Sequence, residues 1–142
     1  MILFDVNVLL NAHRSGQAHH VVARELLESV VNAPPPFAIS ESVLGAFVRI
    51  ATHPRAFSTP TPLDIALEFT DSVLRRPNAR IVRPGDRHWR IFEDLCRRTQ
   101  ARGSIVADAQ HAALAIEHGC EWISFDRDFS RFPGLRWRHP LD

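Results

Sequence analysis

The sequence contains no lysine, so all 17 of its basic residues are arginines. Without lysine the chain cannot form the Gly-Lys-Ser/Thr phosphate-binding loop or a lysine Schiff base. It also lacks the lysine that phosphoaspartyl receiver domains and phosphatases normally place beside the phosphoryl group. The six glycines never occur as Gly-x-Gly, which excludes the dinucleotide-binding fingerprint. Tyrosine is absent too, so an RNA-recognition sheet built on stacked aromatic rings is not expected.

Cysteine is scarce, and signals for membrane insertion or secretion are missing. Cys96 and Cys120 do not form a Cys-x-x-Cys pair, so we expect reduced thiols and neither a disulfide scaffold nor a zinc site. No apolar run approaches the ~18 residues of a membrane span. The segment Met1–Asp5 has no basic residues and reaches a carboxylate at once, unlike a signal peptide. The sequence therefore predicts a cytoplasmic protein with no membrane contact.

The length and the charge pattern describe a small domain with a basic middle. A chain of 142 residues fits one domain, which we expect to span residues 1–142. The net charge of +1 hides an uneven distribution, because residues 75–102 carry nine arginines against three acidic residues while both flanks are net acidic. A basic segment of this kind either favours a polyanionic partner or forms the solvated face of a helix.

Short apolar runs alternate with helical patterns along the chain. Strands are predicted at 1–4, 37–39, 79–82, 121–125 and 135–138. Helices are predicted at 18–31, 40–51, 62–75, after Asp86, and at 104–118. The residues expected to cap three of these helices are Ser40, Thr61 and Asp86. The aromatic residues expected in the core are Trp89, Phe92 and Trp122. This alternation predicts an α/β fold, a three-layer α/β/α sandwich around a short, mainly parallel sheet.

Acidic residues stand at the ends of three predicted strands. Asp5 follows the first strand, Glu41 follows the second by two residues, and Asp126 follows the fourth. An aspartate at such a position is often only a helix cap or a turn former. In open parallel sheets, however, ligands bind beyond the carboxyl ends of the strands. A fourth acid, Asp108, lies at the border of the buried face of the helix 104–118, where aspartate has poor helix propensity.

Four carboxylates in one cleft repel one another unless some are protonated or a multivalent cation neutralises them. A site made only of oxygen ligands suits Mg²⁺ or Mn²⁺. Such an ion lowers the pKa of bound water and stabilises charge on a phosphate, so the chemistry indicated is metal-assisted hydrolysis of a phosphoryl ester. Asn7 and Ser124 lie two residues from Asp5 and Asp126 and are expected to orient a water molecule or a carboxylate.

The acidic residues occur within four short motifs. These are Asp5-Val6-Asn7, Glu41 after a short strand, Asp108-Ala109 followed by Ala112-Ala113, and the run Ser124-Phe125-Asp126-Arg127-Asp128-Phe129. In this order and spacing the motifs resemble those of PIN-domain nucleases. The length and the ending through Phe132-Pro133-Gly134-Leu135 are similar to the VapC toxins of bacterial toxin–antitoxin pairs. The resemblance covers essentially the whole chain.

The resemblance implies a PIN domain with Mg²⁺- or Mn²⁺-dependent endoribonuclease activity on structured RNA such as tRNA or rRNA. The acidic cluster would be Asp5, Glu41, Asp108 and Asp126. Whether Asp126 or Asp128 is the closer ligand stays open, and we favour Asp126 because it directly follows the predicted strand. The resemblance also implies a cognate antitoxin and a homodimer. The alternative function is a PIN-like binding module for RNA or protein that has lost catalysis.

Two further sets of residues are expected to contact partners. The arginines expected near the mouth of the site, where they would hold the RNA backbone, are Arg14, Arg102 and Arg127. The apolar helix positions expected to bind an antitoxin helix or a second copy are Val22, Leu26, Leu44 and Phe47.

Overall fold

Five strands of three residues each form one sheet in which every neighbouring pair is parallel. In the computed structural model, which describes residues 1–142, the strands are β1 (Ile2–Phe4), β2 (Phe37–Ile39), β3 (Ala79–Ile81), β4 (Glu121–Ile123) and β5 (Arg136–Arg138). Their order across the sheet is β3-β2-β1-β4-β5. All five predicted strands are confirmed, with ends that differ by at most two residues, and the sheet is wholly parallel.

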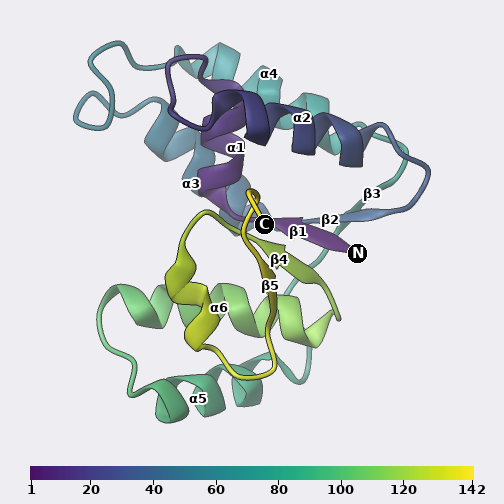
Figure 1. Ribbon diagram of the computed structural model, residues 1–142, viewed down its shortest axis with the longest axis vertical. Coiled ribbons are helices and arrows are strands. Elements are labelled where there is room, and N and C mark those ends of the chain that lie inside the picture. Colours follow the sequence, from purple (N-terminus) through teal and green to yellow (C-terminus); the bar gives the residue numbers. More distant parts are fainter.

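Six α-helices cover the sheet and complete the α/β fold that the sequence predicts. They are α1 (Val6–His13), α2 (His20–Val31), α3 (Glu41–Ala51), α4 (Leu63–Leu74), α5 (His88–Thr99) and α6 (Ser104–Glu117). Figure 1 shows α1–α4 on one side of the sheet and α5 and α6 on the other. A short 3₁₀ helix, η1 (Arg127–Arg131), joins β4 to β5.

The central strands are apolar because helices cover both of their faces. All three residues of β2 are buried, as are Leu3 and Phe4 of β1. Trp122 of β4 is completely buried, which confirms the prediction for this residue. A strand buried on both faces has no polar side, so its sequence shows a continuous apolar run where a half-exposed strand would alternate. The longest helix of the fold has 14 residues, and none has the length and apolarity that a membrane span requires.

The helix α1 is the one α-helix that the sequence analysis did not predict. It has eight residues, too few for a clear amphipathic period, and an isolated helix of this length is unstable in water. Its stability comes from packing, since Val8, Leu9 and Leu10 are buried against the rest of the fold. Asp5 is its N-cap and accepts a hydrogen bond of 2.6 Å from the backbone N–H of Val6. The carboxylate at the end of β1 is therefore also a helix cap.

The three predicted caps are wrong in detail. Ser40 does precede α3, but its hydroxyl bonds that of Ser42 and not a backbone N–H. The helix α4 begins one residue later than expected, and the hydroxyl of Thr61 accepts a hydrogen bond from Arg14 instead. Asp86 makes no cap, because α5 begins only at His88. Thr61 and the segment before α5 have tertiary partners that local sequence cannot reveal, whereas Ser40 bonds a near neighbour.

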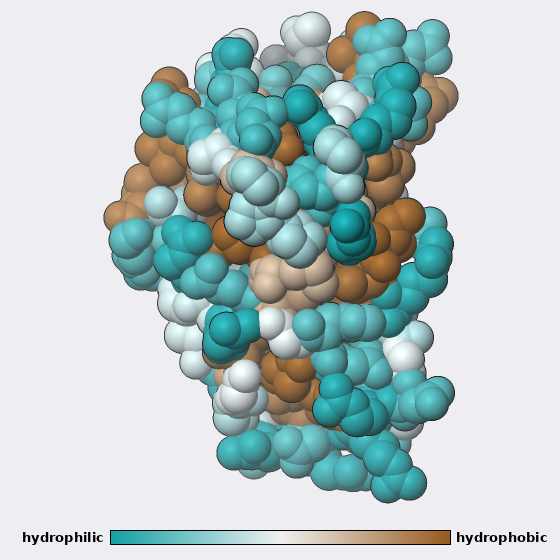
Figure 2. Space-filling view, turned by 90° about the vertical axis from the view of Figure 1, so that its right-hand side faces the viewer, coloured by the Kyte–Doolittle hydropathy of each residue, from teal (hydrophilic) through white to brown (hydrophobic).

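The prediction that Trp89 belongs to the core is also wrong. Its side chain is 60% exposed, whereas Phe92 on the same helix is buried as expected. Helical spacing assigns both residues to one face of α5, but it does not reveal whether a neighbouring element covers the first turn. The other exposed apolar residues include Leu63, Ile65 and Leu67 on α4. Figure 2 shows one face of the molecule, on which several apolar patches are separated by polar side chains.

Candidate active site at the carboxyl edge of the sheet

The sheet topology marks the place where a ligand is expected. From β1 the chain moves outward to β2 and β3, and then returns to the other side of β1 to form β4 and β5. In open α/β sheets, binding sites lie outside the carboxyl ends of the strands at this change of direction. Phe4 and Ile123 are register partners, so Asp5 and Ser124, the residues that follow them, meet at this edge.

Asp5 is held by three hydrogen bonds. Its Oδ1 accepts from the backbone N–H of Val6, and its Oδ2 accepts from the Ser124 hydroxyl at 2.6 Å and from the Asn7 amide at 3.1 Å. Asn7 also donates to the Ser124 hydroxyl, and its own Oδ1 accepts from the backbone N–H of Phe125. Asn7, in the first turn of α1, therefore links the residue after β1 to the segment after β4. Asn7 and Ser124 both donate hydrogen bonds to Asp5, so they fix the orientation of its carboxylate.

Three of the four predicted acidic residues influence one another electrostatically. The pKa of Asp5 is raised to about 6, because burial and, to a smaller extent, the negative charge of Asp126 outweigh the lowering effect of the Ser124 hydrogen bond. Burial also raises the pKa of Asp108, and the charges of Asp126 and Asp5 act in the same direction. Asp5, Asp108 and Asp126 therefore share one region of negative potential, although they are far apart in sequence.

Asp126, not Asp128, belongs to this group. Its backbone N–H donates to the Ser124 hydroxyl at 3.0 Å, and its carboxylate caps η1 by accepting from the backbone N–H of Asp128 at 2.8 Å. Asp128 is exposed and forms an ion pair with Arg131 at 3.4 Å. The sequence predicted that Asp126 directly follows the strand. Because β4 ends at Ile123, Asp126 instead comes three residues after it.

Glu41 lies apart from the three aspartates. It is the first residue of α3, it is exposed, and its Oε1 accepts a hydrogen bond of 2.7 Å from Arg83 Nε. Its charge is not among those that shift the pKa of Asp5 or Asp108. Glu41 instead lines a cavity of about 610 Å³ beside α6, together with Gln110 and His111. The structure therefore brings together three predicted acids and places the fourth in a neighbouring cavity.

Two residues that the sequence analysis did not select lie close to Asp108. His111, one turn further along α6, stacks its ring on Trp122 with centroids 5.3 Å apart. Burial lowers the pKa of His111, so its imidazole is neutral at pH 7. The charge of Arg131 in η1 acts on Asp108 in the lowering direction. The spacing of three residues between Asp108 and His111 on a helix could have indicated His111. Nothing in the local sequence indicated Arg131.

The three predicted RNA-contacting arginines lie in different settings. Arg14 is at the opposite end of α1 from Asp5, about 12 Å along the helix axis, and its guanidinium donates to Thr59 and Thr61. Arg102 is exposed just before the start of α6. Arg127 is exposed in η1 and pairs with the carboxylate of Asp142 at 3.5 Å.

The donor chemistry of the site fits a hard divalent cation, while the side chains are not yet arranged as a coordination sphere. The acidic groups in this region are carboxylates, and burial first and the charge of Asp126 second raise the pKa values of Asp5 and Asp108. Oxygen donors of this kind suit Mg²⁺ and Mn²⁺. No three His, Cys, Asp or Glu side chains converge closely enough in this structure to hold a metal ion.

Comparison with solved structures agrees with the fold. The chain superposes on the toxin–antitoxin complex VapBC2 from Rickettsia felis, bound to a promoter DNA fragment, with a TM-score of 0.71 at 18% identity, and the match covers 98% of both chains. It superposes on VapC20 of Mycobacterium tuberculosis, described as a toxin that cleaves the sarcin–ricin loop, with a TM-score of 0.67 at 24% identity over 95% of this chain and 98% of the other.

Comparison of sequences identifies the family. The sequence model of the PIN domain family matches residues 2–135. The chain is 44% identical to the VapC ribonuclease Mb2897 of Mycobacterium bovis, over 100% of this chain and 97% of the relative. It is 37% identical to ribonuclease VapC31 of Mycobacterium tuberculosis, over 99% of each chain. With the parallel sheet and the aspartates at its carboxyl edge, these matches show that the chain belongs to the PIN domain family and, within it, to the VapC ribonucleases.

Proposed function

We propose that this chain is an Mg²⁺- or Mn²⁺-dependent endoribonuclease and the toxin of a bacterial toxin–antitoxin pair. The observation that carries the proposal is the mutual electrostatic influence of Asp5, Asp108 and Asp126 at the carboxyl edge of the sheet. Asp5 is buried and Asp108 half-buried beside the exposed Asp126, and carboxylates placed in this way are costly for a fold unless they serve a ligand. Relatives over the full length of the chain are named as ribonucleases, which makes RNA the substrate class.

The residues that would hold the ion are Asp5, Asp108 and Asp126. Glu41 would join them only by releasing Arg83, so we assign it a peripheral role. When bound, a divalent ion neutralises the carboxylates, lowers the pKa of a water ligand and stabilises negative charge on the phosphate. Asn7 and Ser124 donate hydrogen bonds to Asp5 Oδ2 and so hold this carboxylate in position for the ion.

The protein's own groups supply the remaining chemistry. Water attacks the phosphorus atom, the bond from phosphorus to the 3′ oxygen breaks, and the products carry a 5′ phosphate and a 3′ hydroxyl. One carboxylate of the site takes the proton of the attacking water, and the departing 3′ oxygen takes up a proton from solvent. Exposed arginines such as Arg102 hold the RNA backbone.

The direct test is cleavage of tRNA and rRNA by the purified protein. We expect cleavage with Mg²⁺ or Mn²⁺, none with EDTA, and a rate at least about 100-fold lower for Asp5→Asn and Asp108→Asn. Asp71→Asn, on the exposed side of α4, is the matched control and is expected to cleave like the wild type. Activity that survives EDTA, or that survives both substitutions together, would overturn the proposal. RNA binding without cleavage under any condition would favour the catalytically inactive module.

The surface available to an antitoxin differs from the sequence prediction. Leu44 and Phe47 are buried in the core and cannot contact a partner, whereas Val22 and Leu26 on α2 are half-buried. The structure instead exposes Leu63 and Leu67, which lie one turn apart on α4 and are 56% and 43% exposed. The sequence pattern did not distinguish core from surface positions on α2 and α3, because both of these helices are amphipathic.

We assign antitoxin binding and homodimer formation to the exposed apolar positions of this helical layer. Solved relatives with this fold include toxin–antitoxin complexes from Rickettsia felis and Salmonella typhimurium. Co-expression with the small protein encoded beside the chain, followed by light scattering, is expected to yield a complex that Leu63→Asp and Leu67→Asp weaken. An unaltered complex in both variants would contradict this surface. A monomer with no co-purifying partner would contradict the assignment as a whole.

A further inference from the structure

A cavity beside the three aspartates has no role in the proposed cleavage reaction. We call it the Gln110 cavity; its polar lining residues include Glu41, Arg83, His88, Gln110 and His111, and its volume is about 610 Å³. This volume lies within the ~300–1,000 Å³ range of small-molecule sites. The cavity lies between the segment that follows β3 and the α6 residues Ala107, Gln110 and His111.

The position of the cavity relative to Asp108 is set by α6. Asp108 directly follows the lining residue Ala107 and lies one turn before His111. The charge of Asp108 acts on His111, which itself lines the cavity, so the aspartate lies close to the cavity wall. If the phosphate of one nucleotide lies at the aspartates, the neighbouring nucleotide of the same RNA strand can therefore reach the cavity.

The chemistry of the lining suits a nucleobase better than a phosphate. Gln110 is exposed and presents both a donor and an acceptor, as the edge of a base requires. Val82, Pro84 and Leu114 supply apolar surface for the flat faces of a ring. The lining contains one arginine, Arg83, and its charge is balanced by Glu41, so the lining favours a neutral ring over a phosphate.

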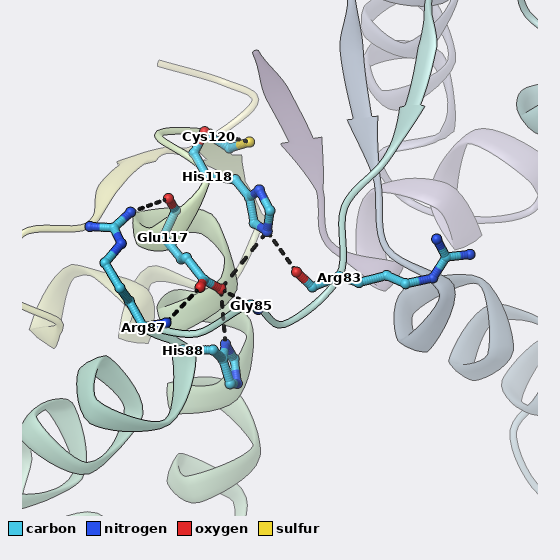
Figure 3. Close-up of polar contacts among 7 residues, drawn as sticks. All are labelled: Arg83, Gly85, Arg87, His88, Glu117, His118 and Cys120. Carbon is cyan, nitrogen blue, oxygen red and sulfur yellow. Dashed lines mark hydrogen bonds and ion pairs between the residues drawn. The ribbon is translucent and has the colours of Figure 1, made fainter.

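The wall formed by residues 83–88 is fixed in place by Glu117 at the end of α6. The Glu117 carboxylate accepts hydrogen bonds from the backbone N–H groups of Gly85 at 2.9 Å and Arg87 at 3.1 Å. His118 Nε2 lies 2.7 Å from the carbonyl oxygen of Arg83, and His88 Nδ1 lies 3.9 Å from Glu117 Oε2. Figure 3 shows these groups arranged around the Glu117 side chain. The cavity is therefore a preformed site.

The fit of this wall depends on a glycine. A Cβ atom at Gly85 would lie 2.7 Å from Glu117 Oε1, closer than real Cβ atoms approach other atoms. The contacted atom is the end of a flexible side chain, so Gly85→Ala would shift the Glu117 carboxylate and weaken its bonds to the two backbone N–H groups. The wall can thus be loosened by a single methyl group that does not itself line the cavity.

We propose that the Gln110 cavity is a nucleobase subsite, which holds one base of the RNA strand next to the scissile phosphate and gives the nuclease its base preference. The proposal rests on the proposed function for the identity of the substrate. It assigns Gln110 to reading the edge of the base, with the ring of His88 and the apolar residues of the wall enclosing it.

The test is an NMR titration of the isotopically labelled protein, in EDTA, with each of the four ribonucleoside 5′-monophosphates. We expect one or more nucleotides to give saturable shifts at Ala107, Gln110 and His88 and none at Gln17. Gln110→Ala should weaken this binding about fivefold, the loss of one hydrogen bond, and Gly85→Ala should also weaken it. Gln17→Ala, a matched change in the turn after α1, should have no effect.

Several results would overturn the subsite. The absence of saturable shifts at the cavity for all four nucleotides, equal binding by Gln110→Ala and the wild type, or the same shifts with inorganic phosphate would each do so. Because this titration needs neither metal nor cleavage, its outcome is independent of the nuclease assay. If the wild type cleaves RNA, Gln110→Ala should reduce the preference among substrates that differ in one base beside the cut. Unchanged preference in that variant would also count against the subsite.

Discussion

The hydroxyl of Ser124 donates a hydrogen bond of 2.6 Å to Asp5 Oδ2, although the two residues are 119 positions apart in sequence. This bond stabilises the charged form of the carboxylate and opposes the burial that raises its pKa to about 6. The same hydroxyl accepts the backbone N–H of Asp126 and thereby connects two of the aspartates. Ser124 is completely buried, so its effect on Asp5 is not weakened by water.

The first prediction concerns the substitution Ser124→Ala. Loss of the hydrogen bond should raise the pKa of Asp5, so the acid limb of the pH–rate profile should move upward by about one pH unit. RNA cleavage at pH 6 should then fall much more than cleavage at pH 8. The exposed residue Ser130 provides the control variant Ser130→Ala, whose profile should match the wild type. An equal loss at both pH values would contradict this role.

The second prediction concerns the stability of the metal-free protein. The pKa of Asp5 is about 6 in the folded chain and 3.8 as its ordinary value, so the folded state disfavours the charged form. The cost of the buried charge is small below the ordinary pKa of 3.8, grows as the pH rises from there to about 6, and stays constant at higher pH. A shift of about two units corresponds to about 3 kcal/mol. Asp5→Asn should therefore raise the free energy of unfolding by up to about 3 kcal/mol at pH 7.5.

Urea unfolding in EDTA at pH 4 and pH 7.5 measures this effect. The two proteins should differ much less at pH 4, where the carboxyl is protonated in the folded state and only about half ionised in the unfolded state. Addition of Mn²⁺ at pH 7.5 should stabilise the wild type more than Asp5→Asn, because the ion binds the folded state through this carboxylate. If the substitution destabilises the protein equally at both pH values, the cost assigned to the buried charge is wrong.

The third prediction concerns the ion pair between Glu41 and Arg83. Both side chains are more than half exposed, so Arg83→Ala should change the free energy of unfolding by less than about 1 kcal/mol. It leaves the Glu41 carboxylate unpaired, and we expect Mn²⁺ binding measured by calorimetry without RNA to strengthen about two- to fivefold. Glu41→Gln should abolish the gain. Arg80→Ala, an exposed change on β3, is the control.

Either result of that experiment locates Glu41. Stronger Mn²⁺ binding in Arg83→Ala places the carboxylate within reach of the ion once its partner is removed. Binding identical to that of the wild type would place Glu41 outside the metal site, in the wall of the Gln110 cavity alone.

The fourth prediction separates two arginines that the sequence analysis treated alike. Arg102 is exposed before α6, whereas Arg14 is held by Thr59 and Thr61 at the far end of α1 from Asp5. In the Asp5→Asn background, Arg102→Ala should lower RNA affinity and reduce the slope of log affinity against log salt by about one. Arg14→Ala should leave the slope unchanged. The reverse result would place the RNA on the α1 side of the molecule.

Local sequence predicted most of the fold because the central strands and the longer helices have clear patterns. The apolar run Phe37–Ile39 and the periodic helix ending at Val31 each contain their own signal. The helix α1 lacked one, since its eight residues are stabilised by their burial. The same limit explains Trp89, because helical spacing places a side chain on a face and does not reveal what covers it.

The candidate site divides in the same way. The sequence by itself determined which residue types stand at the strand ends, and hence that Asp5 and Asp126 meet at one edge of a parallel sheet. Only the tertiary structure decided that Asp126 and not Asp128 acts on Asp108, and that Glu41 pairs with Arg83. Chain direction and periodicity are local properties, whereas ion pairing and burial depend on which distant segments pack together.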